Sequence, residues 1–218
     1  LWVLIIAFAS IFGIKTSSGA VSLNNLLILS CYLSLDMPAA LWAALWGTFL
    51  SEVAWGVLAV WLRQPRRSPL ETVTHLASNI TFQVFSLVPA AMTYRALGGT
   101  LPFSAAGLLD TRLVPLVTLI VVYTATNNLI FAAFLAIRRE SVIDYFHRRR
   151  RAILFFELLP LPSAGLIAAI HNELGAPVFA VFCVYLSAIL IVIHLLERAR
   201  LEAELRVRQL TALSVISD

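Results

Sequence analysis

Four polar side chains that lie inside otherwise apolar stretches are the first candidates for chemistry, namely Glu52, His75, Asn79 and Gln83. Ionisable and amide groups are costly in hydrocarbon, so each needs a partner or a function. Three of the four recur every four residues within one stretch, and this spacing places side chains on one face of a helix. A carboxylate, an imidazole and two amides inside apolar stretches have the chemistry to hold a proton, a cation or a polar ligand.

Polar groups of two later stretches are expected at a comparable depth, so that four helices would supply one inner network. The candidate residues of this inner polar network or ligand site are Glu52, His75, Asn79, Gln83, Asn127, Asn128 and Glu157, with Asn24 and Asn25 at its flank. Two interpretations stay open: side chains that only hold the helices together, or a cation, proton or polar-ligand site that communicates with the last helix. If Glu52 and Glu157 approach each other, repulsion and desolvation favour one shared proton.

Two prolines follow Glu157 closely. Pro160 and Pro162 have no N–H to donate to the carbonyl groups four residues earlier, so a helix that runs through them is expected to kink. A kink beside a carboxylate is either a hinge or a packing irregularity. In a membrane, neighbouring protein or water must satisfy the carbonyls that it frees.

A second candidate ligand site is expected on the opposite side of the bundle. Asp36, Arg95 and His171 approach the outer face there, and Asp36 with Arg95 could form an ion pair or clamp a polar ligand. Trp42 and Trp46 lie near the same level, where tryptophan more often anchors a helix at the membrane interface. An apolar or lipid-like ligand between the helices would leave no signature in the sequence.

The elements that must position these residues follow from composition. Of the 218 residues, 60% are hydrophobic and 13% charged, whereas a soluble domain carries about a quarter charged residues. This balance excludes a water-soluble globule, a disordered chain, a coiled-coil rod and a disulfide-stapled module. Cys31 and Cys183 lie in apolar stretches and are interpreted as packing residues, and the sequence has no metal motif such as CxxC or HExxH.

Seven apolar stretches are visible, at about 1–14, 22–35, 39–62, 70–94, 113–137, 152–171 and 176–196. They predict an all-α membrane protein with six to seven transmembrane helices, in which residues 1–196 form the bundle. The first stretch spans only about 21 Å at 1.5 Å per residue, so further residues are expected upstream. The second is also short and is either tilted or partly re-entrant.

The basic residues predict the orientation of these helices. Alternation puts ten basic residues on one side (Lys15, Arg63, Arg66, Arg67, Arg138, Arg139 and Arg148–Arg151) and two, Arg95 and Arg112, on the other. This asymmetry predicts the N-terminus outside and the C-terminus inside. Basic clusters in short loops indicate anionic lipid rather than nucleic acid as the partner.

The tail, residues 197–218, has a different character. It is rich in strong helix formers and in both signs of charge, so the last membrane helix is expected to continue into the cytoplasm. Its residues follow a three-four spacing in two registers: Leu196, Ala199, Ala203, Arg206, Leu210 and Leu213, or Leu201, Leu205, Arg208, Ala212 and Val215. Both a weak parallel coiled coil that forms a homodimer and an amphipathic helix on the membrane surface fit this pattern.

The chain resembles the MASE-type multi-span sensor modules of bacterial signalling proteins. The features that carry the likeness are ELLPLPSAGLIAAIHNELG (157–175), the hydrophobic final span, and LLERARLEAELRVRQLTALSVISD (195–218), which is similar to linkers that lead into GAF domains. The resemblance implies a homodimeric receptor of the bacterial inner membrane. It also implies a diguanylate cyclase, HD-GYP phosphodiesterase or histidine kinase output domain beyond residue 218.

The leading functional hypothesis is therefore a sensory module that relays a ligand or a membrane signal through its last helix. The alternatives are a substrate-binding component of a transporter and an accessory subunit of a membrane complex. Neither an enzyme nor a cofactor is expected in these residues. A retinal protein needs a lysine in its last span, whereas Lys15 lies in a loop, and His75 with His194 is a weak basis for haem.

Overall fold

The chain folds into helices joined by short connections. The computed structural model describes residues 1–12, 14–16, 19–21, 23–61, 68–104, 106, 113–152 and 160–217. Its elements are α1 (Trp2–Ile11), β1 (Ile14–Thr16), β2 (Gly19–Val21), α2 (Asn24–Ser34), α3 (Met37–Trp61), α4 (Pro69–Ala96), α6 (Leu113–Ile137), α7 (Val142–Ala152) and α8 (Ser163–Ser217). The two strands form a small antiparallel hairpin in which Ile14 lies opposite Val21 and Thr16 opposite Gly19.

Among the described residues, four helices are long and apolar enough to cross a membrane: Met37–Leu58 of α3, Pro69–Ala96, Leu113–Ile137, and Ser163–Leu196 of α8. They indicate a membrane protein, as the composition predicts. The predicted total of six to seven spans is not confirmed. The helices α1 and α2 have only 10 and 11 residues, which is about half of a ~30 Å hydrocarbon core at 1.5 Å per residue.

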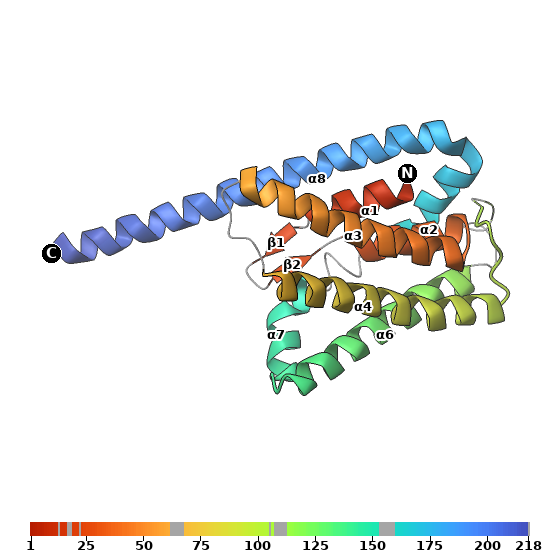
Figure 1. Ribbon diagram of the computed structural model, residues 1–218, viewed down its shortest axis with the longest axis horizontal. Coiled ribbons are helices and arrows are strands. Elements are labelled where there is room, and N and C mark those ends of the chain that lie inside the picture. Colours follow the sequence, from red (N-terminus) through yellow and green to blue (C-terminus); the bar gives the residue numbers. More distant parts are fainter. Residues whose placement is uncertain are drawn as a thin grey trace.

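Helix α8 combines the stretches that were predicted as the sixth and seventh spans. It is interrupted at Gly175, whose φ of 77° and ψ of 173° are not helical. A positive φ of this kind is open mainly to glycine. Figure 1 shows the chain turning back at this point, so that Ser163–Leu174 forms a short arm and the residues from Ala176 onward form the long one. The start of the predicted sixth span, at 153–159, lies outside the described residues.

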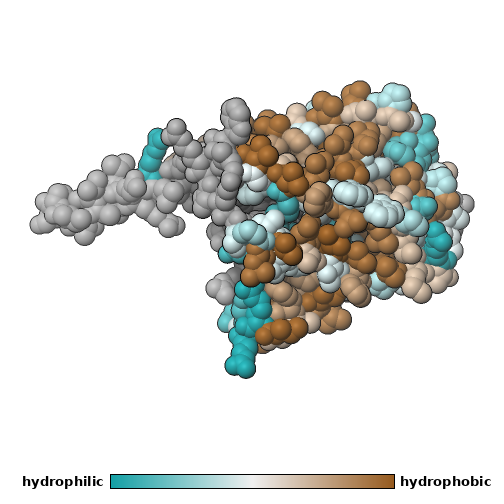
Figure 2. Space-filling view, in the orientation of Figure 1, coloured by the Kyte–Doolittle hydropathy of each residue, from teal (hydrophilic) through white to brown (hydrophobic). Residues whose placement is uncertain are grey.

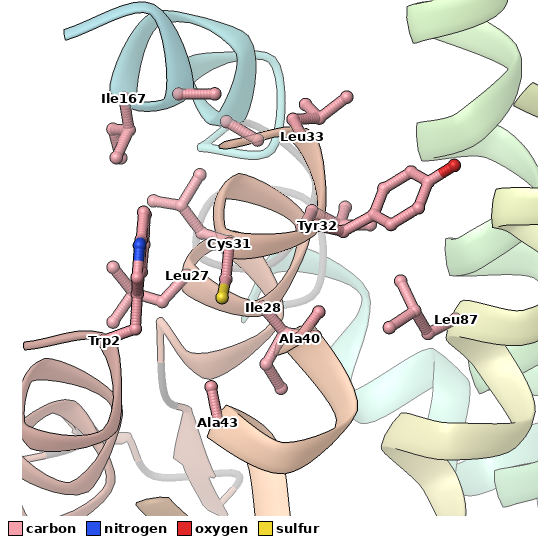
Figure 3. Packing of buried hydrophobic residues seen from close by; sticks show 14 of the residues in the cluster. Trp2, Leu27, Ile28, Cys31, Tyr32, Leu33, Ala40, Ala43, Leu87 and Ile167 are labelled. Atoms are coloured by element: carbon pink, nitrogen blue, oxygen red, sulfur yellow. The ribbon is translucent and has the colours of Figure 1, made fainter. Parts of the chain in front are cut away.

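Helix α2 is the centre of the bundle. All its residues from Leu26 to Ser34 are buried, and Figure 3 shows them surrounded by Trp2 of α1, Ala40 of α3, Leu87 of α4 and Ile167 of α8. The neighbours in space run from α8 through α1 and α2 to α3, then α4, then α6. A helix too short to span is therefore held inside protein, where the polar groups of its ends need not face lipid.

Helix α3 shows the side-chain distribution typical of a membrane helix. Its buried residues are small, namely Ala40, Ala43, Ala44, Gly47, Thr48 and Ser51, whereas Trp42, Phe49 and Val57 are exposed. Small residues let helix backbones approach closely, and large apolar residues are compatible with lipid. Figure 2 shows a broad band of hydrophobic residues over one face of the bundle, with hydrophilic residues gathered at the end opposite the tail.

Candidate functional site

Helices α3 and α4 bring Glu52 and His75 together. The Nδ1 atom of His75 lies 2.7 Å from Oε1 of Glu52. The Glu52 side chain is only 9% exposed, whereas the His75 side chain is 45% exposed, so the carboxylate lies inside the helix pair and the imidazole covers it. The sequence predicted Glu52 at the depth of Asn79 and placed His75 on the same helix face as Asn79, and the structure brings Glu52 and His75 into direct contact.

Asn79 lies one helical turn after His75 and contacts the same imidazole. Its Nδ2 atom is 3.3 Å from Nδ1 and 3.5 Å from Nε2 of His75. If Nδ1 carries the hydrogen, it donates to the carboxylate of Glu52, and Nε2 is left to accept from the amide of Asn79. The imidazole then connects an acidic group of α3 with an amide of α4.

The second contact lies one turn further along the same helix pair. The hydroxyl of Thr48 donates to Oε1 of Gln83 at 3.3 Å, and both side chains are buried. Thr48 precedes Glu52 by four residues, and Gln83 follows Asn79 by four. The five residues Thr48, Glu52, His75, Asn79 and Gln83 thus form one polar line between α3 and α4, which we call the α3–α4 seam.

The start of α4 fixes this register. Ser68 accepts from the backbone N–H of Glu71 at 3.2 Å, and the Glu71 carboxylate accepts from the N–H of Ser68 at 2.8 Å, which is a capping box. Pro69 occupies the first helical position, where its missing N–H costs nothing. The helix therefore begins at a defined residue, and His75 comes after its second turn.

The predicted polar residues of α6 do not join the seam. Asn128 donates to the carbonyl of Thr124 on its own helix at 2.8 Å. Asn127 is half-buried, and no hydrogen bond among the described residues connects it to α3 or α4. Glu157, the proposed partner of Glu52, lies outside the described residues, so the structure does not address a carboxylate pair.

The residues at the flank of the predicted network connect other helices. The phenol of Tyr123 on α6 donates to Oδ1 of Asn25 on α2 at 2.9 Å, and Nδ2 of Asn24 donates to Ser10 of α1 at 2.5 Å. These contacts fix α2 at its first turn. They correspond to the packing interpretation of the amides, because each amide meets a neighbouring helix.

Pro160 and Pro162 do not kink a described helix. They precede α8, where the N–H of Ser163 donates to the carbonyl of Pro160 at 2.9 Å and starts the helix. The break in α8 lies at Gly175 instead, followed by Pro177. The residues before Pro160, at 153–159, lie outside the described part of the chain, so the kink predicted at these two prolines stays a prediction, and the break at Gly175 is one that the sequence analysis did not predict.

The predicted outer residues are divided among separate contacts. Asp36 accepts from the N–H of Ala39 at 2.8 Å and caps α3, and it forms no ion pair with Arg95 among the described residues. Arg95 lies close to the phenol of Tyr32, whose hydroxyl donates to the carbonyl of Ala91 at 3.2 Å.

His171 belongs to an aromatic cluster with Trp2 and Phe179. The ring centroids lie 5.6 Å apart for Trp2 and 4.9 Å apart for Phe179. Its Nδ1 is 2.9 Å from Oδ1 of Asn172, whose amide in turn donates to the carbonyl of Phe103 at 2.8 Å. His171 therefore holds the first arm of α8 against α1 and the connection after α4. The contacts favour a packing role for it.

Sequence reasoning missed Thr48, Tyr123 and Trp2. A signal existed for Thr48, because a polar residue four positions before Glu52 lies on the same helix face. The sequence holds no such signal for Tyr123 and Trp2. Their partners belong to α2 and α8, and only the folded chain shows which helices meet. In the described part of the chain, no group of three His, Cys, Asp or Glu side chains is arranged to hold a metal ion.

The chain was compared with known protein families, with curated proteins and with solved structures, and no match was found. The resemblance to MASE-type modules therefore remains a prediction from the sequence. What the structure shows of the α3–α4 seam is its chemistry: a carboxylate, an imidazole, two amides and a hydroxyl that join two apolar helices through hydrogen bonds.

Proposed function

We propose that the chain is a membrane-embedded sensory module, with its N-terminus outside and its C-terminus in the cytoplasm, and that α8 relays its signal. One observation carries the proposal. After Gly175, α8 continues without another break to Ser217, through the apolar residues up to Leu196 and on into the charged tail. Figure 1 shows the tail leaving the bundle as a straight rod. A rod that is rigid across the membrane boundary can transmit a rotation or a shift.

The proposed orientation rests on the arrangement of the helix ends. In Figure 1, α3 and α6 end, and α4 begins, on the side where α8 leaves the bundle. The sequence assigns ten basic residues to this side and two to the other, so the side with the tail is the cytoplasmic one. A receptor in this orientation presents its last helix to an output domain in the cytoplasm.

The packing of α8 supports a choice between the two registers of the tail. Phe179, Cys183 and Leu190 are buried against the bundle, whereas Val181, Tyr185 and Val192 on the opposite face are exposed. Three helical turns take about eleven residues. Three turns after the exposed Val192 comes Ala203, and three turns after the buried Leu190 comes position 201.

The register that contains Ala199 and Ala203 therefore continues the face of α8 that points away from the bundle. We call this face the outward register, and both alanines are exposed on it. In a homodimer the two bundles lie on opposite sides of the paired tails, and membrane insertion forces the two copies of α8 to be parallel. The outward register is then the pairing face, and the register of position 201 continues the face that carries the buried Leu190.

Cysteine cross-linking in native membranes tests this proposal. The full chain with Cys31→Ala and Cys183→Ala serves as background, and single cysteines replace Ala199 or Ala203 on the outward register. Leu201 and Leu205, on the opposite register, are the matched control positions. We expect disulfide-linked dimers to form several-fold faster at Ala199 and Ala203, because a disulfide needs Cα atoms closer than about 7 Å.

Equal cross-linking at all four positions, or none at any of them, would contradict the pairing of the outward register. Absence of tail contacts in every membrane preparation would favour a transport component or an accessory subunit instead. In the proposed module the α3–α4 seam is the candidate input, because a change in its protonation or occupancy alters the packing of α3 on α4. Such a change affects α8 only if the proton or ligand binds one of the two packings of the bundle more tightly than the other.

A further inference from the structure

Helix α7 lies across the inner end of the bundle and is not used by the proposed function. Its sequence, VIDYFHRRRRA, places apolar and aromatic residues in the first two turns and four consecutive arginines after them. Figure 1 shows α7 running across the ends of α4 and α6, whereas the long helices run roughly parallel to one another. Helix α7 therefore runs across the direction of the long apolar helices at their ends.

Local structure fixes the corner between α6 and α7. Arg139 has a φ of 58°, its N–H donates to the carbonyl of Ala136 at 3.0 Å, and the N–H of Glu140 donates to that of Leu135 at 3.0 Å. This is the Schellman arrangement that ends a helix sharply. Ser141 then caps α7, since its hydroxyl accepts from the N–H of Asp144 at 3.3 Å.

An aromatic cluster then holds α7 against the spans. The ring of Tyr145 lies 4.9 Å from that of Phe131 on α6, and Phe131 lies 5.7 Å from Phe82 on α4. The guanidinium of Arg138 lies 5.4 Å above the ring of Phe134 and 3.4 Å from the carboxylate of Glu140. The first two turns of α7 are therefore in a defined place relative to the hydrocarbon-spanning helices.

Large apolar side chains are left uncovered beside this corner. Ile137 and Ile143 are each 81% exposed, the highest values among the described large hydrophobic residues. Arg138 and Arg139 directly follow the span Leu113–Ile137, and the run 148–151 brings the number of arginines within fourteen residues of its end to six. Figure 2 shows hydrophilic and strongly hydrophobic residues side by side at the lower left, where α6 ends and α7 begins.

We propose that α7 is a docking surface for the headgroups of anionic phospholipids in the inner leaflet. The exposed isoleucines suit the boundary between headgroups and acyl chains, and the arginines suit lipid phosphates, which guanidinium groups bind in a bidentate way. Charge complementarity selects this occupant, because clusters of four to eight basic residues just cytoplasmic of a span are attracted to anionic leaflets. An acidic soluble partner would satisfy the arginines but would not explain apolar residues at the level of the lipid.

Fluorescence quenching by lipids tests the proposal on the full chain. Ile143→Cys is labelled with bimane in the Cys31→Ala, Cys183→Ala background and reconstituted into vesicles of phosphatidylcholine, or of equal parts phosphatidylcholine and phosphatidylglycerol. A fraction of the lipid carries bromine on its acyl chains and quenches a label that inserts. We expect stronger quenching in the vesicles with phosphatidylglycerol, and its loss in high salt, where charges are screened over a few ångströms.

The matched pair of variants removes four arginines in each of two places. Replacing Arg148–Arg151 by glutamine should abolish the preference for phosphatidylglycerol, since each basic residue contributes roughly fivefold to binding at an anionic surface. Replacing Arg198, Arg200, Arg206 and Arg208 of the tail by glutamine removes the same charge and should leave the preference intact. An independent readout uses the unlabelled variants. A polymer extracts each variant from the vesicles together with its surrounding lipid, and the ratio of phosphatidylglycerol to phosphatidylcholine in that lipid is measured.

Three outcomes would overturn the proposal. One is equal quenching in both kinds of vesicle, and another is an equal effect of the two arginine variants. The third is a label that stays in water in both vesicles and is shielded only when RNA or polyglutamate is added. The placement of α7 at the inner leaflet rests on the orientation proposed above, whereas lipid binding by α7 does not depend on the pairing of the tails, so the cross-linking and the quenching experiments can fail separately.

Discussion

At the scale of single residues, the pair of Glu52 and His75 is the most informative feature. Its carboxylate is almost buried within a membrane span, and an imidazole 2.7 Å away satisfies it. Removing one member of such a pair costs more than removing both, because a buried polar group then lacks its partner. The two side chains should therefore behave as a unit.

A double-mutant cycle checks this coupling. We expect His75→Leu to lower the free energy of unfolding by about 1–2 kcal/mol, a value reduced from that of a fully buried pair because His75 is half-exposed. Glu52→Gln in the same chain should recover part of the loss. Unfolding in mixed detergent micelles measures both effects, and His147→Leu on exposed α7 is the control. Additive effects of the two substitutions would show that the pair is not coupled.

The sequence predicted much of the seam but not all of it. The recurrence of His75, Asn79 and Gln83 every four residues is a property of the helix itself, so their common face could be foreseen. Asn128 has the same chemistry, yet it donates to a carbonyl of its own helix. Such a local bond is open to any polar residue in a helix. The sequence alone cannot tell this use of an amide from a contact between helices.

At the scale of elements, the close approach of α1 to α3 depends on Gly47. A Cβ atom at this position would lie 2.6 Å from Cγ2 of Ile6 and 3.3 Å from the carbonyl of Val3. Neither neighbour is the free end of a long side chain, so the helices must separate to admit a methyl group. Glycine is therefore required here by packing and not by backbone conformation.

Alanine substitutions at two glycines of α3 test this requirement. Gly47→Ala should lower the free energy of unfolding by about 1–3 kcal/mol through overpacking. Gly56 is the matched control on the same helix, because a Cβ atom there would have no neighbour within 4 Å. Gly56→Ala should be neutral or stabilise by up to about 1 kcal/mol through helix propensity. Equal effects at both positions would show that α1 does not pack closely on Gly47.

The number of spanning elements is the part of the fold that stays unconfirmed. Hydropathy reports that a segment is apolar, and α2 is a short apolar helix that is buried by protein from Leu26 to Ser34. A short apolar stretch is therefore ambiguous between a span and a buried half-helix. The break in α8 was equally hidden, since Gly175 was one glycine among nine and the prolines at 160 and 162 were the more obvious signal.

At the scale of the whole molecule, the sidedness of the bundle determines which end can signal. The connection after α4 and the projecting tail of α8 lie at opposite ends in Figure 1. An impermeant thiol reagent applied to intact cells tests whether the membrane separates them. In the background without native cysteines, Leu97→Cys probes the first end and Val207→Cys the second, and both side chains are well exposed.

We expect Leu97→Cys to react in intact cells and Val207→Cys to react only after the membrane is opened, because ten of twelve basic loop residues hold the tail side in the cytoplasm. His147→Cys on α7, where the native side chain is exposed, should follow Val207→Cys, since both lie on the arginine-rich side. Reaction of Val207→Cys in intact cells would place the tail and α7 outside, and a cytoplasmic relay through α8 would then be impossible. If Leu97→Cys and Val207→Cys reacted from the same side of the membrane, the long helices would not cross the bilayer one after another along the chain.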